Sequence, residues 1–186
     1  MRLSTKPRDR QQAAEPGPRR RVVVLDDDAF LRMLVARALP DATVCEAWRV
    51  EVARRMAPVS APDAVIVDRR LPDGDGLDVV AELRHHPVVG DVPLVVLTAG
   101  YFENDRLTAL TAGVDEYLDK MTHLDELAPR LDRLYALSGE ERAARRQALT
   151  SLLAAGATGD LDPLPEPEEP QPERRRWLRR RAVAQM

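Results

Sequence analysis

The chain has a single cysteine, Cys45, and no long apolar run. One cysteine excludes a disulfide within the chain. No stretch approaches the roughly 18–20 apolar residues that a transmembrane helix needs. The basic residues near the N-terminus are not followed by the apolar core of a secretory signal. These absences favour the reducing cytoplasm as the compartment.

The chain does contain enough apolar residues for a core, and its charge is distributed unevenly. Its 186 residues, 44% of them hydrophobic, suffice for one ordinary domain with extensions. Residues 22–137 carry 21 acidic side chains against 12 Lys and Arg, whereas the net charge is +5 over residues 1–21 and +1 over residues 138–186. An acidic centre is therefore flanked by segments that contain arginine clusters.

Short apolar runs alternate with helical patterns from Arg21 onward. The candidate buried strands are Val22–Leu25, Thr43–Cys45, Ala64–Val67, Leu94–Leu97 and Val114–Leu118. Each is followed by apolar residues at helical spacing, and Pro129 in the last of these segments predicts a kink or a late helix start. Five alternations of this kind predict an α/β fold, a five-stranded parallel sheet with helices on both faces and right-handed crossovers.

The composition changes outside this region. Ser138 and Glu141 form a capping-box pattern that predicts one more helix. Proline-rich acidic sequence favours an extended linker, and polar sequence without periodicity favours disorder. We therefore expect a disordered basic leader over residues 1–21, a domain over 22–137, an extra helix over 138–156, a linker over 157–173 and an Arg-rich tail over 174–186.

Three consecutive aspartates end the first predicted strand, in the stretch VVVLDDDAF. In a parallel sheet the carboxyl ends of the strands form the edge where ligands bind. Asp68, Thr98 and Lys120 follow three other predicted strands, so all should reach that edge. Carboxylates gathered there repel one another and favour a hard cation such as Mg2+. This set of groups suits phosphoryl transfer to an aspartate.

Four pieces of sequence, in order, carry a family resemblance: VLDDD, VIVDRRLPDGDG, VVLTAG and AGVDEYLDK. The 30-residue step from Asp68 to Thr98 and the 22-residue step from there to Lys120 also match the family. Over residues 22–137 the chain resembles the receiver domain of two-component response regulators, the fold of the bacterial chemotaxis receiver.

The resemblance implies that Asp68 is the phosphorylated residue. It also implies that Asp26 and Asp27 hold Mg2+ together with Asp68 and the backbone carbonyl of Arg70. Taken singly, an aspartate after a strand is more often a helix cap or a loop residue, and we expect that role for Asp28.

The resemblance further implies that the Thr98 hydroxyl and the Ala99 amide take phosphoryl oxygens, while the Lys120 ammonium neutralises another. Tyr117 would be the aromatic switch residue that moves inward with the threonine. Taken alone, a threonine there is more often a cap and a tyrosine there a half-buried sheet aromatic.

Two local features qualify the resemblance. Receivers usually have a proline after the lysine, joined by a cis bond, and here Met121 occupies that place. Because a non-proline cis bond costs about 3–4 kcal/mol, we expect a trans bond. In LPDGDG, Gly74 and Gly76 permit positive φ or a close backbone approach beside the site.

Only 49 residues follow Leu137, which favours a stand-alone receiver whose output is a protein contact. The expected partners are a histidine kinase or phosphotransfer protein and an unknown downstream protein. The first would supply the phosphoryl group, as would a small phosphodonor. A homodimer through the fourth helix, fifth strand and fifth helix, with pairs Arg106–Glu126 and Glu116–Arg130, is an open alternative, although such charges are more often plain solvated surface.

Two other function classes are open. In one, the Arg-rich tail binds nucleic acid, as in a transcriptional or antitermination regulator, although no recognisable reading helix is present. Contact with an anionic membrane, folding back on the acidic core and a solvated tail are the other interpretations of this segment. In the other, the chain is an aspartyl-phosphate hydrolase of the haloacid dehalogenase type. That family needs a second acid two residues after its nucleophile, and Arg70 stands there, so only self-phosphorylation and slow self-dephosphorylation are expected.

Overall fold

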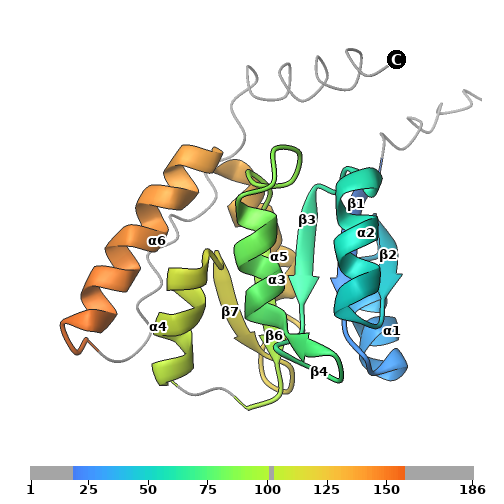
Figure 1. Cartoon of the computed structure of the whole chain (residues 1–186), viewed down its shortest axis with the longest axis horizontal. Helices are drawn as coiled ribbons and strands as arrows, with labels where there is room; N and C mark the ends of the chain where they lie inside the picture. The colour runs from blue at the N-terminus through green and yellow to red at the C-terminus, as the bar shows by residue number, and fades with distance from the viewer. Residues whose placement is uncertain (1–18, 101–102, 158–186) are drawn as a thin grey trace, which may run out of the picture.

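The computed structural model describes residues 19–100 and 103–157. They form the predicted α/β fold, with a five-stranded parallel sheet in the order β2-β1-β3-β6-β7 (Figure 1). The strands are β1 (Arg20–Leu25), β2 (Ala42–Ala47), β3 (Ala64–Val67), β6 (Leu94–Thr98) and β7 (Glu116–Asp119).

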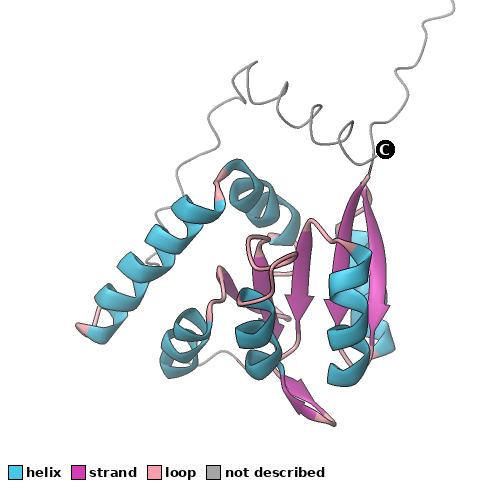
Figure 2. Ribbon diagram, turned by 45° about the horizontal axis from the view of Figure 1, so that its top comes forward, coloured by secondary structure: helices cyan, strands magenta, loops and turns pink. Residues whose placement is uncertain are grey.

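Helices cover both faces of the sheet (Figures 1 and 2). The helices are α1 (Ala29–Ala38), α2 (Val50–Ser60), α3 (Gly76–Arg84), α4 (Glu103–Ala112), α5 (Leu127–Ala136) and α6 (Gly139–Ala154). Apolar residues of α2, α3 and α4 pack in one core cluster, and those of α1 and α5 pack in a second cluster. The sheet separates these two clusters.

The central strands are buried on both faces, which is why they are continuous apolar runs rather than alternating ones. In β1, Val23 and Leu25 belong to the first cluster, whereas Val22 and Val24 belong to the second. All four residues of β3 are buried as well. Parallel pairing, with Leu25 opposite Val67, brings the carboxyl ends of β1 and β3 together at one edge of the sheet.

The structure refines several predicted boundaries. β1 begins at Arg20, inside the predicted leader, because Arg20 pairs with Ala42 of β2. The Arg20 guanidinium also lies 3.7 Å from the centre of the Tyr135 ring. α5 begins at Leu127, so Pro129 lies in its first turn, and the late start is confirmed.

The extra helix is confirmed as α6, and the Ser138–Glu141 capping box closes its first turn. The remainder of the predicted leader, the predicted linker beyond residue 157 and the Arg-rich tail lie outside the described residues. Within the described ranges, no helix has both the length and the apolar character needed to cross a membrane.

Candidate functional site

Three aspartates meet at the carboxyl edge of the sheet. Asp26 follows β1 and Asp68 follows β3, and these strands are neighbours in the sheet. The backbone N–H of Asp68 donates to the Leu25 carbonyl at 2.7 Å, which places the two carboxylates side by side. One carboxylate oxygen from each of Asp26, Asp27 and Asp68 lies within 4.8 Å of the others. The predicted convergence of these acids is therefore present.

Lys120 joins two of these acids. It follows β7, and its Nζ lies 2.7 Å from Asp26 Oδ2 and 3.1 Å from Asp68 Oδ2. All three side chains are more than nine-tenths buried, whereas Asp27 is exposed. The backbone N–H of Lys120 donates to the Thr98 carbonyl at 2.9 Å, which fixes the start of the loop after β7 against β6. The site therefore has an open acidic side at Asp27 and a closed side at Lys120.

Burial and charge oppose each other at this pair. Burial raises the pKa of Asp68, Lys120 partly offsets that effect, and the nearby Asp26 adds to it. Burial works to lower the pKa of Lys120, but its hydrogen bond to Asp26 and the charge of Asp68 outweigh burial and raise it. Lys120 therefore stays charged, and the acids around it gain from positive charge.

Thr98 is buried and is the last residue of β6, the strand next to β3 in the sheet, with Ala99 directly after it. Tyr117 of β7 is also buried and belongs to the core cluster that contains α4. Its side chain is therefore covered by its neighbours in this structure. The strand register pairs Tyr117 with Val96 of β6, so both predicted switch residues lie on adjacent strands.

The role of Arg69 was not predicted. This residue directly follows Asp68, and its Nη1 lies 2.5 Å from Oδ2 of Asp105 on α4. Its pKa is raised first by that hydrogen bond, with burial opposing and the nearby Tyr117 adding. Arg69 thus connects the residue after the proposed nucleophile to α4. The only signal for this role in the sequence was that a cationic residue directly follows Asp68.

The loop after Lys120 is organised without a proline. No cis peptide bond is present in the described part of the chain, so the bond to Met121 is trans, as expected. The carboxylate of Asp119 accepts from the N–H groups of Met121 at 2.7 Å and Thr122 at 3.2 Å. Burial opposes these bonds, but together they lower the pKa of Asp119. Asp119 therefore holds the turn that positions Lys120.

Gly76 allows the backbone to approach Asp68 closely. A Cβ at Gly76 would lie 2.0 Å from the carbonyl oxygen of Asp68, so there is no room for a side chain at this position. A Cβ at Gly74 would meet only a Val50 methyl at 3.3 Å. Close approach at Gly76 is thus confirmed, and neither glycine is among those with positive φ.

Residues around the site also take the predicted local roles. Asp28 is the N-cap of α1, where its side chain accepts from the Phe30 N–H at 2.8 Å. Arg70 lies in the short strand β4 (Arg70–Leu71), which pairs with β5 (Gly74–Asp75). The sequence analysis did not foresee this two-stranded hairpin. The role of the Arg70 carbonyl as a metal ligand stays a prediction.

The donor set fits a magnesium ion. Three carboxylates within reach of one another, two buried and one exposed, are hard oxygen ligands of the kind Mg2+ prefers. The exposed position of Asp27 leaves a route to the site, and Mg2+ usually keeps several waters.

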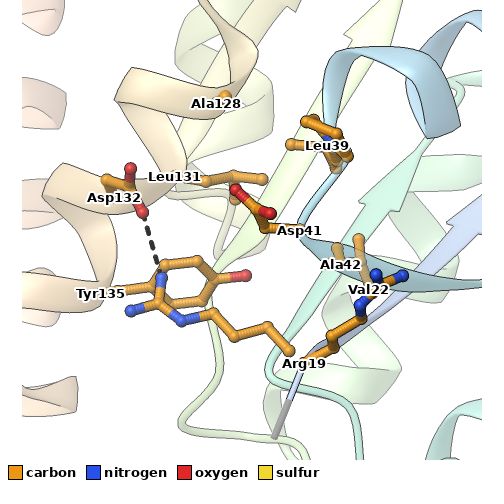
Figure 3. A pocket seen from close by; sticks show the side chains of 11 residues that line it. Arg19, Val22, Leu39, Asp41, Ala42, Ala128, Leu131, Asp132 and Tyr135 are labelled. Atoms are coloured by element: carbon orange, nitrogen blue, oxygen red, sulfur yellow. Dashed lines mark hydrogen bonds and ion pairs between the residues drawn. The ribbon is translucent and has the colours of Figure 1, made fainter. Parts of the chain in front are cut away.

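A separate hollow of about 430 Å³ lies at the amino end of the sheet (Figure 3). Tyr135 and Asp132 of α5 line it from one side, and Asp41 and Arg19 line it from the other. Burial raises the pKa of Tyr135 to about 12, although Arg20 opposes the rise. None of the predicted site residues lines this hollow, so it is separate from the acidic site.

The comparison with known families decides the identity of the domain. The family described as "Response regulator receiver domain" matches residues 22–132, which is more than half of the chain. The chain belongs to this family. Receivers of this family are signalling domains of two-component systems rather than metabolic enzymes.

Bacterial relatives and solved structures agree with this assignment. The chain is 36% identical over 112 residues to the KDP operon transcriptional regulatory protein KdpE of Escherichia coli, covering 59% of this chain and 48% of that protein. It is 38% identical over 131 residues to the transcriptional regulatory protein TrcR of Mycobacterium tuberculosis, covering 67% and 49%. The receiver therefore spans about half the length of these relatives.

Among solved structures, the BeF3-activated receiver domain of Klebsiella pneumoniae RstA is 27% identical, with a TM-score of 0.57 over 62% of this chain and 97% of that chain. The chemotaxis response regulator CheY4 of Vibrio cholerae is 23% identical, with a TM-score of 0.58 over 63% and 99%. The second likeness supports the fold alone. Both agree with the predicted chemotaxis-receiver fold.

Proposed function

We propose that this receiver accepts a phosphoryl group on Asp68 in a Mg2+-dependent reaction. The observation that carries the proposal is the buried Lys120 ammonium between Asp26 and Asp68, beside the exposed Asp27. A carboxylate oxygen of Asp68 attacks phosphorus, the bond from phosphorus to the donor breaks, and the leaving group keeps the electron pair. The donor is a histidine kinase, a phosphotransfer protein or a small phosphodonor.

Asp26, Asp27, Asp68 and the Arg70 carbonyl would hold Mg2+, which when bound neutralises charge on the phosphoryl oxygens. The Thr98 hydroxyl and the Ala99 N–H donate to two of these oxygens. Lys120 moves from its shared position between the two carboxylates to the phosphoryl group and compensates part of its charge of about −1.5 to −2.

The same groups connect the reaction to a change of shape. When Thr98 is drawn toward the phosphoryl group, Tyr117 of β7 follows as the switch residue, and the chain shifts between two pre-existing arrangements. The output is a protein contact, either with a downstream protein or with a second copy of the chain through α4, β7 and α5. Slow self-dephosphorylation returns the chain to its first arrangement.

A transcriptional output is the second candidate, because KdpE and TrcR are transcriptional regulatory proteins by name. In this form the Arg-rich residues 174–186 would contact nucleic acid, with strong salt dependence. Removal of residues 174–186 separates the two candidates in a DNA gel-shift assay of the phosphorylated chain. If the full chain shifts DNA and the chain without residues 174–186 does not, the second candidate is supported. If neither chain shifts DNA, the first candidate is supported.

The test of phosphorylation is intact mass after incubation of the full chain with Mg2+ and acetyl phosphate. We expect a gain of one phosphoryl group that disappears in Asp68→Asn and when EDTA removes Mg2+. Asp78→Asn is the matched control, because Asp78 is an exposed aspartate on α3. Equal labelling of Asp68→Asn and Asp78→Asn would contradict the proposal.

A further inference from the structure

We infer that α6 is a built-in cover of the receiver whose docking is coupled to the state of Asp68. The covered surface, called here the α6 contact face, consists of α4 and of Asp115 and Glu116 at the start of β7. The inference depends on the proposed phosphorylation of Asp68. It goes further because it gives the C-terminal helix of this chain a regulatory role.

Arginines of α6 bind the buried acids of this face. Arg145 donates to Glu116 Oε1 at 2.7 Å and to the Asp115 carbonyl at 2.7 Å. Arg146 forms an ion pair with the Asp115 carboxylate. Both acids are almost fully buried, so these bonds are made out of contact with bulk water. Charge-assisted bonds of this kind hold a helix in one position and orientation.

A third arginine holds the N-terminal end of α6. Arg142 is only 6% exposed and donates to the carbonyls of Leu134, Leu137 and Asp91. It therefore ties the first turn of α6 to the end of α5 and to the loop before β6. With Arg145 and Arg146 it forms a row of three cations along the side of the helix that faces the domain.

Apolar contact adds to these bonds. α6 packs along α4, and Figures 1 and 2 show the two helices side by side. Leu110 of α4 and Leu149 of α6 are 5% and 2% exposed, yet neither belongs to the two clusters that flank the sheet. We infer that they cover each other across the helix contact. In contrast, Leu152 of α6 is 45% exposed.

Two routes connect this face to Asp68. The first runs through Arg69, which follows Asp68 and pairs with Asp105 on α4. The second runs along β7, where Tyr117, which lies close enough to Arg69 to help raise its pKa, is the direct neighbour of Glu116. Two of the regions that α6 touches, α4 and the start of β7, are therefore linked to the residue next to the phosphorylation site.

The direction of the coupling follows from the contacts that accompany the docked α6. Its bonds fit α4 and β7 in the arrangement in which Lys120 pairs with Asp26 and Asp68. If the phosphoryl group draws in Thr98 and Ala99, the start of α4 at Glu103 moves with them, and the fit to α6 worsens. Phosphorylation then loosens α6, and by reciprocity a loosened α6 favours the phosphorylated state. The loosened face becomes accessible to a partner.

The test compares two variants of the full chain in the same helix. Leu149→Asp removes the buried contact, and Leu152→Asp adds the same charge at an exposed site three residues later. Arg145→Ala is a second way to loosen α6, because Glu116 keeps an ion pair with Arg130 at 3.3 Å. Hydrogen exchange of residues 139–154 is measured with and without Mg2+ and beryllofluoride, a phosphoryl mimic, and the affinity for beryllofluoride is measured by titration.

We expect beryllofluoride to speed exchange in α6 of the native chain and of Leu152→Asp by about fivefold or more, the lower end of ordinary allosteric coupling. Leu149→Asp and Arg145→Ala should exchange fast in α6 without ligand and bind beryllofluoride more tightly by a similar factor. Unchanged exchange of residues 64–68 in all variants shows that the receiver stays folded before ligand is added.

If residues 64–71 respond to beryllofluoride but α6 does not, the coupling is wrong and the proposed function stands. Equal beryllofluoride affinity of Leu149→Asp and Leu152→Asp also contradicts the coupling. If residues 64–71 do not respond in any variant, the proposed function itself is wrong, and the coupling with it.

Discussion

Asp26 and Asp68 share the ammonium group of Lys120, and this sharing determines how the site balances charge before phosphorylation. A buried carboxylate needs a compensating cation, and removal of one partner leaves an uncompensated charge in the interior. Lys120 and Mg2+ can both supply positive charge to these acids. Their contributions should therefore be visible separately.

Replacement of Lys120 by Met should make the stability of the chain depend on Mg2+. Without Mg2+, the unpaired acids should lower the free energy of unfolding by on the order of 3 kcal/mol. Added Mg2+ should recover part of that loss, so the thermal midpoint rises more in the variant than in the native chain. Arg55→Met is the control, because Arg55 is exposed and pairs within α2. Equal gains from Mg2+ in both variants would contradict this account.

Gly76 is the second residue on which the geometry of the site depends. Gly76→Ala would place a methyl group 2.0 Å from the Asp68 carbonyl oxygen, so the backbone of Asp68 must move. We expect a stability loss of about 1–3 kcal/mol and phosphoryl labelling reduced by about tenfold or more, because small misplacements of a reacting group are costly. Stability by urea unfolding and labelling by intact mass check this prediction.

Gly74→Ala is the matched control for that experiment, since its Cβ would meet only a valine methyl at 3.3 Å and no backbone atom. It should label at close to the native rate. If the two alanine variants behave alike, close approach at Gly76 is not what positions Asp68.

At the scale of the elements, the ion pair Arg69–Asp105 links the site to α4. Arg69→Gln should leave Asp68 able to accept a phosphoryl group but should uncouple α4 from it. Hydrogen exchange of residues 103–112 should then respond less to beryllofluoride than in the native chain. Arg54→Gln, which breaks a comparable pair with Glu82 between α2 and α3, is the control. An α4 response that is equally strong in both variants would exclude Arg69 as the link.

The sequence predicts the elements of the sheet well because each central strand is apolar on both faces. β3 has the predicted bounds, and β6 differs by one residue. The predicted bounds of the edge strand β2 are less accurate, since only part of Ala42–Ala47 is apolar. The β4–β5 hairpin was missed because two-residue strands carry no periodic signal.

The candidate site was predictable to the extent that its residues follow strands directly. Asp26, Asp68 and Lys120 meet because parallel strands all end at the same edge. The partners of Arg69 were not predictable in this way, since Asp105 lies within a helix. Nor was the position of α6, because charged residues such as Arg145 on a helix are typical of a solvent-exposed surface until a buried acid is known to face them.

For the whole molecule, ligand binding at the site should stabilise the folded chain by mass action. Beryllofluoride at 100 times its dissociation constant should add about 2.7 kcal/mol to the free energy of unfolding. For a chain of this size each kcal/mol raises the Tm by about 2–4 °C. The gain should require Mg2+ and should vanish in Asp68→Asn, as differential scanning fluorimetry can measure. An equal rise of Tm in that variant would place the ligand elsewhere.

The position of the phosphoryl group tests the central claim most directly. The full chain is incubated with Mg2+ and acetyl phosphate, treated with borohydride, which reduces an aspartyl phosphate to homoserine, digested, and sequenced by tandem mass spectrometry. The account predicts homoserine at position 68, and at neither Asp26 nor Asp27. Homoserine at another aspartate, or none at position 68 after documented phosphorylation of the intact chain, would contradict it.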